Sequence, residues 1–155
     1  MISPWMPNGD LKSFLKLHPE ADHVLLLVEI AAGLEYLHMR NPAVVHGDLK
    51  ATNVLVSEDE HACIADFGLS DTSTDPEEHE RNGYSSTWKN GGNIRWQAPE
   101  LLVSYQRTTQ SDMFAFGRVI YEVFTGLVPF EELKEGQVYS VVDQGRLPPR
   151  PGIEW

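Results

Sequence analysis

The hydrophobic positions of the chain recur at helical spacing in two long stretches. In residues 20–40, apolar side chains return every three or four positions, at Val24, Leu27, Ala31, Leu34 and Leu37, which predicts a helix. Further apolar residues widen this face, so we expect this helix to be packed on much of its surface. Residues 110–125 are apolar nearly all round and are followed by Gly126. This pattern predicts a helix that is buried in the middle of the domain and stops at the glycine.

Shorter elements are predicted around these two helices. Asp10 can cap a short helix, and short apolar runs separated by acidic turns are typical of buried strands. The predicted short helices are residues 11–17, 99–103 and 134–143, and the predicted strands are residues 44–45, 54–56 and 62–65. Residues 71–92 are polar and have no apolar period. They are predicted to form a long loop, and loops of that length in a small domain are usually functional.

Composition and charge narrow the class of protein. With 155 residues, 41% of them hydrophobic and 23% charged, the chain suits one globular domain with a sizeable core. The formal net charge of -11 at pH 7 argues against nucleic acid or an anionic membrane as the main partner. The longest apolar run, residues 24–28, is too short to cross a bilayer. The single cysteine, Cys63, excludes an internal disulfide framework. We therefore expect a cytoplasmic protein without a membrane segment.

Three short segments carry the candidate chemistry. They are residues 46–53 (HGDLKATN), 66–68 (DFG) and 98–100 (APE). Phosphoryl transfer requires a group that orients the attacking hydroxyl, a cation for the transferred phosphate and oxygen ligands for Mg²⁺. Asp48, Lys50, Asn53 and Asp66 are residues of these types. Each one alone is typical of an ordinary surface loop, but their joint spacing favours a shared site.

In this order, with an apolar helix behind them, the three segments resemble the signature of protein kinases. The resemblance implies a mainly α (α+β) fold, namely the C-terminal lobe of the kinase fold with short β strands at the catalytic loop. It implies that Asp48 and Lys50 are catalytic and that Asn53 and Asp66 hold Mg²⁺. It also implies ATP as cofactor, bound near the hinge by Met6, Asp10, Leu11 and Leu55. For Leu11 and Leu55, a role as plain core leucines is an equally good interpretation.

Further residues refine the resemblance. Lys50 is similar to the lysine of Ser/Thr kinases, whereas Arg95 and Trp96 before the APE segment resemble tyrosine kinases and their tyrosine-kinase-like Ser/Thr relatives. Both features together favour the tyrosine-kinase-like group, with a protein as substrate. Asp112 is expected to brace the catalytic loop through backbone hydrogen bonds, or alternatively to cap its helix. His46 is expected to be a packed residue of the loop. A hydrolase that uses His46 and Asp48 has little support, because no nucleophilic serine accompanies them.

The sequence also departs from the kinase pattern. Gly47 stands where most kinases have an arginine that pairs with a phosphate on the activation segment, which predicts an activity independent of that pairing. Asn93 stands where Ser/Thr kinases often have a threonine that contacts the catalytic residues. The resemblance places the Gly-rich loop and its lysine before Met1 and the last helices after Trp155. Residues 1–155 are therefore expected to be a partial kinase domain, from the end of the hinge through the helix after the central one. The alternative is a non-catalytic interaction module that binds a partner kinase or scaffold.

Overall fold

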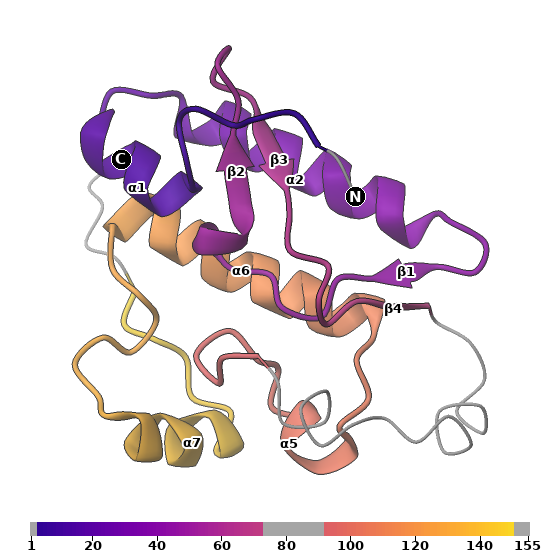
Figure 1. Ribbon diagram of the computed structural model, residues 1–155. Coiled ribbons are helices and arrows are strands. Elements are labelled where there is room, and N and C mark those ends of the chain that lie inside the picture. The colour runs from indigo at the N-terminus through magenta and orange to yellow at the C-terminus, as the bar shows by residue number, and fades with distance from the viewer. Residues whose placement is uncertain (1–2, 73–91, 151–155) are drawn as a thin grey trace.

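The computed structural model describes residues 3–72 and 92–150 (Figure 1). The helices are α1 (Leu11–Leu17), α2 (His23–His38), η1 (Ala51–Asn53, a 3-10 turn), α5 (Leu101–Ser104), α6 (Thr109–Thr125) and α7 (Glu135–Asp143). The strands are β1 (Val44–Val45), β2 (Val54–Val56), β3 (Ala62–Ile64) and β4 (Asp71–Thr72). The expected mainly α (α+β) class is confirmed. The predicted loop at residues 71–92 begins with β4 instead, and the part of it at residues 73–91 lies outside the described residues.

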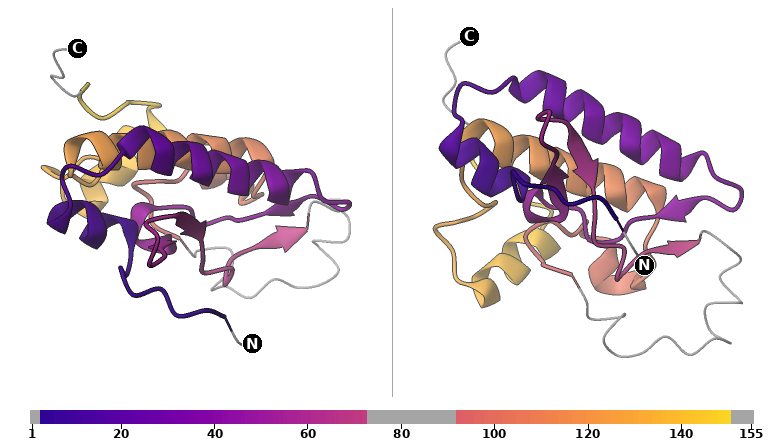
Figure 2. Two further views of the ribbon diagram at one scale, coloured as in Figure 1. Left: turned by 90° about the horizontal axis from the view of Figure 1, so that it is seen from above. Right: turned by 45° about the horizontal axis from the view of Figure 1, so that its top comes forward.

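The two long helices form the frame on which the other elements lie. Helices α2 and α6 pack against each other, and β3 lies across α2 (Figures 1 and 2). Helix α1 contacts η1, β2 and α6. Helices α5 and α7 lie on the other side of α6 from the β2–β3 hairpin in Figure 1. The loop between β1 and η1 lies along α6, because β1 and η1 both contact this helix.

Two small antiparallel ladders bring distant segments together. In the first, β2 pairs with β3, so that Val54 faces Ile64 and Val56 faces Ala62. In the second, β1 pairs with β4, so that Val45 faces Asp71. Because β1 precedes the 46–53 segment and β4 follows the 66–68 segment, the second ladder holds the two chemical segments at neighbouring positions.

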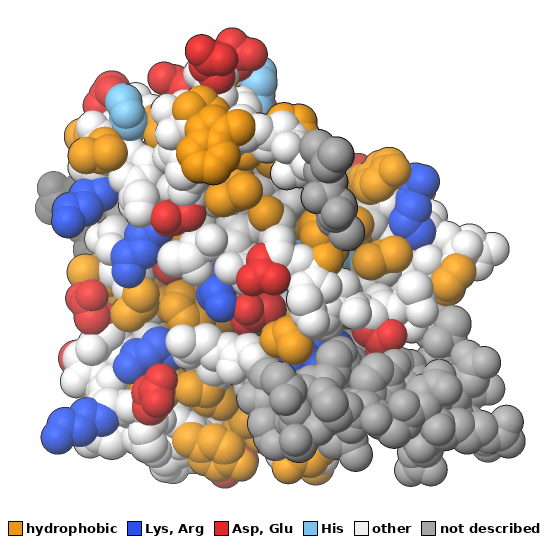
Figure 3. Space-filling view, in the orientation of Figure 1, with side chains coloured by type: hydrophobic (Ala, Val, Ile, Leu, Met, Phe, Trp, Pro, Cys, Tyr) orange, Lys and Arg blue, Asp and Glu red, His pale blue; other side chains and the backbone are white. Residues whose placement is uncertain are grey.

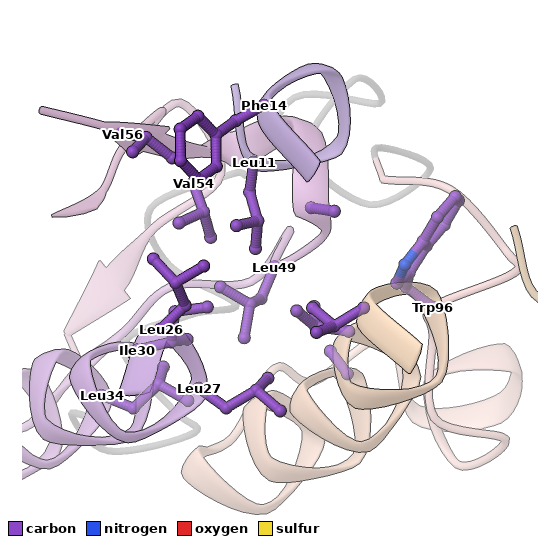
Figure 4. Packing of buried hydrophobic residues seen from close by; sticks show 14 residues of the cluster. Leu11, Phe14, Leu26, Leu27, Ile30, Leu34, Leu49, Val54, Val56 and Trp96 are labelled. Atoms are coloured by element: carbon purple, nitrogen blue, oxygen red, sulfur yellow. The ribbon is translucent and has the colours of Figure 1, made fainter. Parts of the chain in front are cut away.

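The core lies between α1, α2, η1, β2 and α6 (Figure 4). Its buried residues are Leu11, Phe14, Leu26, Leu27, Ile30, Leu34, Leu49, Ala51, Val54, Val56, Trp96, Ala115, Val119 and Val123. Leu49 and Ala51 are the members contributed by the 46–53 segment, so the backbone between the chemical side chains is anchored in the core. A second cluster, Phe130, Val138 and Val142, lies under α7.

Local signals set most of the helix boundaries. The side chain of Asp10 accepts a hydrogen bond from the Ser13 amide (3.0 Å), which confirms it as the N-cap of α1. Helix α2 begins three residues later than predicted, because Asp22 caps it through the Leu25 amide (2.9 Å). Helix α6 ends at Gly126, whose φ of 70° is the left-handed conformation of a C-terminal cap.

Two expectations about helix burial are wrong. Helix α2 is covered by α6 and β3 on one face only, so Val24, Leu25 and Val28 are 62%, 49% and 57% exposed. Hydrophobic side chains are visible among polar ones on the molecular surface in Figure 3 as well, as is normal for folded proteins. The buried face of helix α6 is only partly apolar, since it includes three charged residues, and the apolar Met113 is 52% exposed.

The three buried charges of α6 are Asp112, Arg118 and Glu122. The guanidinium of Arg118 lies over the rings of Phe114 and Phe130, at 4.9 and 5.0 Å from their centroids. Burial lowers the pKa of Arg118 to about 10. The two carboxylates face the 46–53 segment and belong to the candidate site.

Candidate active site

The 46–53 segment, which we call the catalytic loop, gathers three of the predicted residues. The Lys50 Nζ lies 2.7 Å from Asp48 Oδ2. Asn53 Nδ2 donates to the same oxygen (3.1 Å) and to the backbone oxygen of Asp48 (2.8 Å). The side chains of Asp48 and Lys50 are only 12% and 24% exposed. A carboxylate, an ammonium group and an amide therefore form one partly buried cluster.

The Asp48 carboxylate is oriented by this cluster. Oδ2 accepts both hydrogen bonds. Oδ1 faces Gly92, and a Cβ atom built on this glycine would lie 3.3 Å from Oδ1. Gly92 has a φ of 89°, a conformation that side chains rarely adopt. Any side chain at this position would crowd Oδ1 and the Gln97 amide, which lies 2.9 Å from the same Cβ position. Gly92 could not be identified from the sequence, because its contact with Asp48 joins positions 44 residues apart along the chain.

Asp112 braces the catalytic loop from α6. Its Oδ2 accepts hydrogen bonds from the His46 amide (2.7 Å) and lies 2.9 Å from His38 Nε2, and its Oδ1 accepts from the Gly47 amide (2.9 Å). The side chain is 1% exposed. The predicted bracing is confirmed, and the cap of α6 is Thr108 instead. These bonds satisfy a buried charge that would otherwise be costly.

Glu122, which lies ten residues after Asp112 on α6, fixes the far end of the catalytic loop. Its Oε2 accepts from the Ala51 amide (3.0 Å) and from Trp96 Nε1 (2.6 Å). Burial raises the pKa of the Glu122 carboxyl, while these two hydrogen bonds and the charges of Lys12 and Lys50 lower it in part. The residue was missed in the sequence, although a glutamate within an apolar helical stretch was the available signal.

His46 is a packed residue, as expected. It has no exposed surface, and its Nε2 lies 2.9 Å from the backbone oxygen of Ala65. Its Nδ1 accepts from the Asp48 amide (3.3 Å), and the Phe67 ring packs against it edge-on with centroids 5.3 Å apart. The Nε2 atom thus joins the catalytic loop to the segment before Asp66, and the Nδ1 atom bonds within the loop.

Asp66 lies beside the catalytic loop but is held by fewer contacts. The Ala65 amide donates to the Asn53 backbone oxygen (2.8 Å), so the end of β3 places Asp66 next to Asn53. Asp66 has a φ of 60° and accepts a hydrogen bond from the Gly68 amide (3.2 Å). A left-handed conformation at a residue other than glycine is uncommon and is enriched at functional sites.

The donor set of Asn53 and Asp66 suits Mg²⁺. Both hydrogen bonds of the Asn53 side chain within the described residues use Nδ2, so its Oδ1 can serve as an oxygen ligand together with the Asp66 carboxylate. Among the described residues, no group of three or more His, Cys, Asp or Glu side chains is arranged to hold a metal. Mg²⁺ is typically bound by one or two protein oxygens together with substrate phosphates, so this sparse set fits it.

The residues expected to bind the nucleoside lie along β2. Asp10 and Leu55 form an isolated antiparallel bridge, and the Val56 amide donates to Gly9 (2.9 Å). Both Asp10 carboxylate oxygens cap α1 through Ser13 (3.0 and 2.7 Å). Met6 and Leu55 are partly exposed, whereas Leu11 is fully buried. The structure thus brings Asp10 and Leu55 together at β2, and the burial of Leu11 favours its interpretation as a core leucine.

Asn93 and Arg95 shape the segment that faces the catalytic loop. Asn93 Oδ1 accepts from the Arg95 amide (3.1 Å), so in the described part of the chain its side chain closes a local turn instead of bonding to Asp48 or Lys50. Arg95 donates to the backbone oxygens of Pro129 (2.8 Å), Phe130 and Leu133 (2.6 Å). This arginine therefore ties the segment before α5 to the loop after α6.

Comparison with known proteins agrees with this geometry. A family model described as protein tyrosine and serine/threonine kinase matches residues 1–154. The human serine/threonine-protein kinase TNNI3K is 32% identical over 139 residues, which cover 86% of this chain and 16% of that protein. The Arabidopsis thaliana serine/threonine/tyrosine-protein kinase HT1 is 33% identical, with 97% of this chain and 38% of that protein covered. Zebrafish (Danio rerio) ephrin type-B receptor 3 is 38% identical, with 96% and 30% covered.

The chain spans well under half the length of these relatives. The relatives include kinases named for serine/threonine and for tyrosine. None of the helices in the described ranges is long and apolar enough to span a membrane.

Proposed function

This chain belongs to the protein tyrosine and serine/threonine kinase family, and from that premise we propose that it carries the catalytic loop of a protein kinase that phosphorylates serine and threonine hydroxyls with ATP. The observation that carries the proposal is the cluster around Asp48, in which Lys50 Nζ (2.7 Å) and Asn53 Nδ2 (3.1 Å) converge on one carboxylate oxygen. The proposal includes the domain assignment of residues 1–155 as part of a kinase domain, from the hinge to the helix after α6.

Each residue of the cluster has a role that follows from its position. Asp48 Oδ1 takes no part in the bonds from Lys50 and Asn53, which both use Oδ2, so we assign to it the hydrogen bond that orients the substrate hydroxyl for attack. Lys50 lies on the same loop and offers a positive charge to the transferred phosphoryl group. Because the charge of the transition state is spread over the phosphoryl oxygens, fixed cations near it lower the barrier.

Asn53 Oδ1 and the Asp66 carboxylate would hold Mg²⁺, which supplies charge neutralisation to the phosphates of ATP. Met6, Asp10 and Leu55 would contact the nucleoside near β2, where Asp10 and Leu55 pair, and Leu11 would support them from the core. Asp10 already caps α1, so a ribose hydroxyl would share the Asp10 carboxylate with the cap. The Lys50 position favours serine and threonine over tyrosine as the acceptor.

The test is an assay of the full-length protein that contains this chain, with ATP, Mg²⁺ and a mixed protein substrate. We expect Asp48→Asn to lower kcat by about 10²- to 10⁴-fold, the usual contribution of a positioned general base. Asp59→Asn is the matched control, because Asp59 lies in an exposed turn. An unchanged kcat in Asp48→Asn would refute the proposal, and phosphoamino-acid analysis of the product separates serine and threonine from tyrosine.

A second candidate function is a non-catalytic module that binds a partner kinase or scaffold. The observation in its favour is Trp5, an aromatic side chain that is 87% exposed, because tryptophan is enriched at protein interaction surfaces. Equilibrium dialysis of the protein with ATP and Mg²⁺ separates the two functions. Binding of ATP that Asp66→Asn weakens supports the kinase, whereas absence of ATP binding together with partner capture that Trp5→Ala abolishes supports the module.

A further inference from the structure

Gly47, which precedes the catalytic Asp48, lies in a space that another residue fills. Its φ is 81°, and a Cβ atom built on it would meet Arg107 Cδ at 2.5 Å and the Leu69 backbone oxygen at 2.6 Å. Distances below about 3 Å are not tolerated between such atoms, so any side chain at this position would have to displace the arginine. The glycine and Arg107 therefore match each other sterically, although 60 positions separate them in the chain.

Arg107 reaches this space from the segment between α5 and α6. It is 6% exposed, and its Nε donates to the Gly47 backbone oxygen at 3.1 Å. A buried guanidinium is costly unless carboxylates lie near it. Burial lowers the pKa of Arg107, while the charges of Asp48, Asp71 and Asp112 raise it again. These carboxylates come from the catalytic loop, from β4 and from α6, so the cation lies where the three segments meet.

Resting on the proposed kinase function, we propose that Arg107 is a positioning residue that supplies, from the loop before α6, the cation that Gly47 cannot provide beside the catalytic aspartate. The arginine holds the Gly47 carbonyl and fills the space left by the absent side chain. Its positive charge acts on Asp48 of the catalytic loop and on Asp71 of β4. The junction between these two segments therefore needs no phosphate group. Nothing in its role requires contact with the substrate or the nucleotide.

Substitution of Arg107 separates this role from simple packing. Arg107→Met keeps most of the aliphatic stem and removes the charge and the donor, and Arg107→Lys keeps the charge. Arg40→Met is the matched control, because Arg40 also donates its Nε to a backbone oxygen (Tyr36, 3.0 Å) but is exposed at the end of α2. Thermal unfolding identifies any variant that does not fold, in which case Arg107→Lys carries the test.

The first readout requires no enzymatic activity. Hydrogen exchange of the phosphatase-treated protein should be faster by about tenfold at the Gly47 and Asp48 amides in Arg107→Met, because a charge-assisted hydrogen bond is lost there. Arg107→Lys should show a smaller increase and Arg40→Met none. If exchange at these amides is unchanged in both Arg107 variants, the proposal is overturned whether or not the protein is a kinase.

The second readout is the kinetics of the full-length, phosphatase-treated protein. We expect the wild type to remain active, Arg107→Met to lose at least about tenfold in kcat with the KM for ATP within about twofold, and Arg107→Lys to recover part of kcat. A purely structural role would not produce this separation of kcat from KM. Equal kcat in Arg107→Met and the wild type, or complete loss of wild-type activity after phosphatase, overturns the proposal. If neither the wild type nor any variant is active before phosphatase treatment, the proposed kinase function is refuted. The hydrogen-exchange data alone then decide the role of Arg107.

Discussion

The catalytic loop and the neighbouring turn at residues 66–70, which we call the Asp66 turn, are held in different ways. Carboxylates of α6 bind the backbone amides of His46, Gly47 and Ala51 at 2.7–3.0 Å. The Asp66 turn has no such anchor among the described contacts: Asp66, Phe67 and Gly68 are exposed. Its link to the loop is the bond from Ser70 Oγ to the His46 oxygen (3.1 Å) and the Phe67 ring against His46.

This difference matches the two tasks proposed for the residues. Asp48 must hold a hydroxyl in a fixed place, and errors of about 1 Å in position are costly for catalysis. Asp66 must receive a metal that arrives with the nucleotide, so a turn that opens more easily suits it. Rigidity is therefore concentrated where α6 supplies buried carboxylates, and it decreases toward the surface.

The largest effect is expected from Asp112→Ala, which removes the anchor of the rigid region. Two backbone amides and the His38 ring lose a charged partner in a site that is 1% exposed. We expect a loss of about 3 kcal/mol in the free energy of unfolding, because hydrogen bonds to buried charges contribute more than neutral ones. Urea unfolding of the chain measures it.

Asp143→Ala provides the control for this substitution, since Asp143 is an exposed aspartate in the last turn of α7. Its effect should remain within about 0.5 kcal/mol. A loss of similar size in both variants would mean that the bonds from α6 do not distinguish the catalytic loop from the surface.

The elements that depend on local signals could be predicted from the sequence. Helix α1 has the predicted bounds, because its cap at Asp10 and its apolar residues are neighbours in the chain. The strands at Val44–Val45 and Val54–Val56 were predicted for the same reason. The burial of α2 was not, because its apolar residues are spread over more than one face and contacts with α6, β1 and β3 decide which face is covered.

The candidate site divides in the same way. Asp48, Lys50 and Asn53 lie within six residues of each other, and their spacing sufficed to predict the cluster. Glu122 and Arg107 act on the loop from 71 and 60 positions away. No local pattern connects such residues to the loop, so their contribution is visible only after folding.

A second way to examine the rigid region is the pH dependence of Glu122→Gln. Burial raises the pKa of Glu122 above its ordinary value of 4.5. A carboxyl with a raised pKa in the folded state favours folding below its ordinary pKa, and this contribution is lost as the pH rises through the folded-state value. We therefore expect the wild type to lose stability relative to the glutamine variant as the pH rises above 4.5.

Urea unfolding at a series of pH values measures this difference. Below the ordinary pKa, both side chains are neutral, and the variant should lie within about 0.5 kcal/mol of the wild type. Glu35→Gln is the control, because Glu35 is exposed on α2. A stability difference that does not change with pH would contradict a raised pKa of the buried Glu122 carboxyl.

The smallest effect is expected from Ser70→Ala, which removes the hydrogen bond between the two regions. The bond joins a neutral hydroxyl to the His46 carbonyl in a partly buried place, so its loss should cost about 1 kcal/mol or less. Because the amides of His46 and Gly47 are bound by Asp112, their hydrogen exchange should stay within about twofold of the wild type. The Ser70 amide, which donates to the Phe67 backbone oxygen at 3.2 Å, should exchange faster.

Ser104→Ala is the control, because it removes a similar bond to the Glu100 carbonyl at the start of α5 (2.9 Å) and should leave both regions unaffected. If the Gly47 amide accelerates as much as that of Ser70, the catalytic loop and the Asp66 turn open as one unit, and the anchoring by α6 does not separate them.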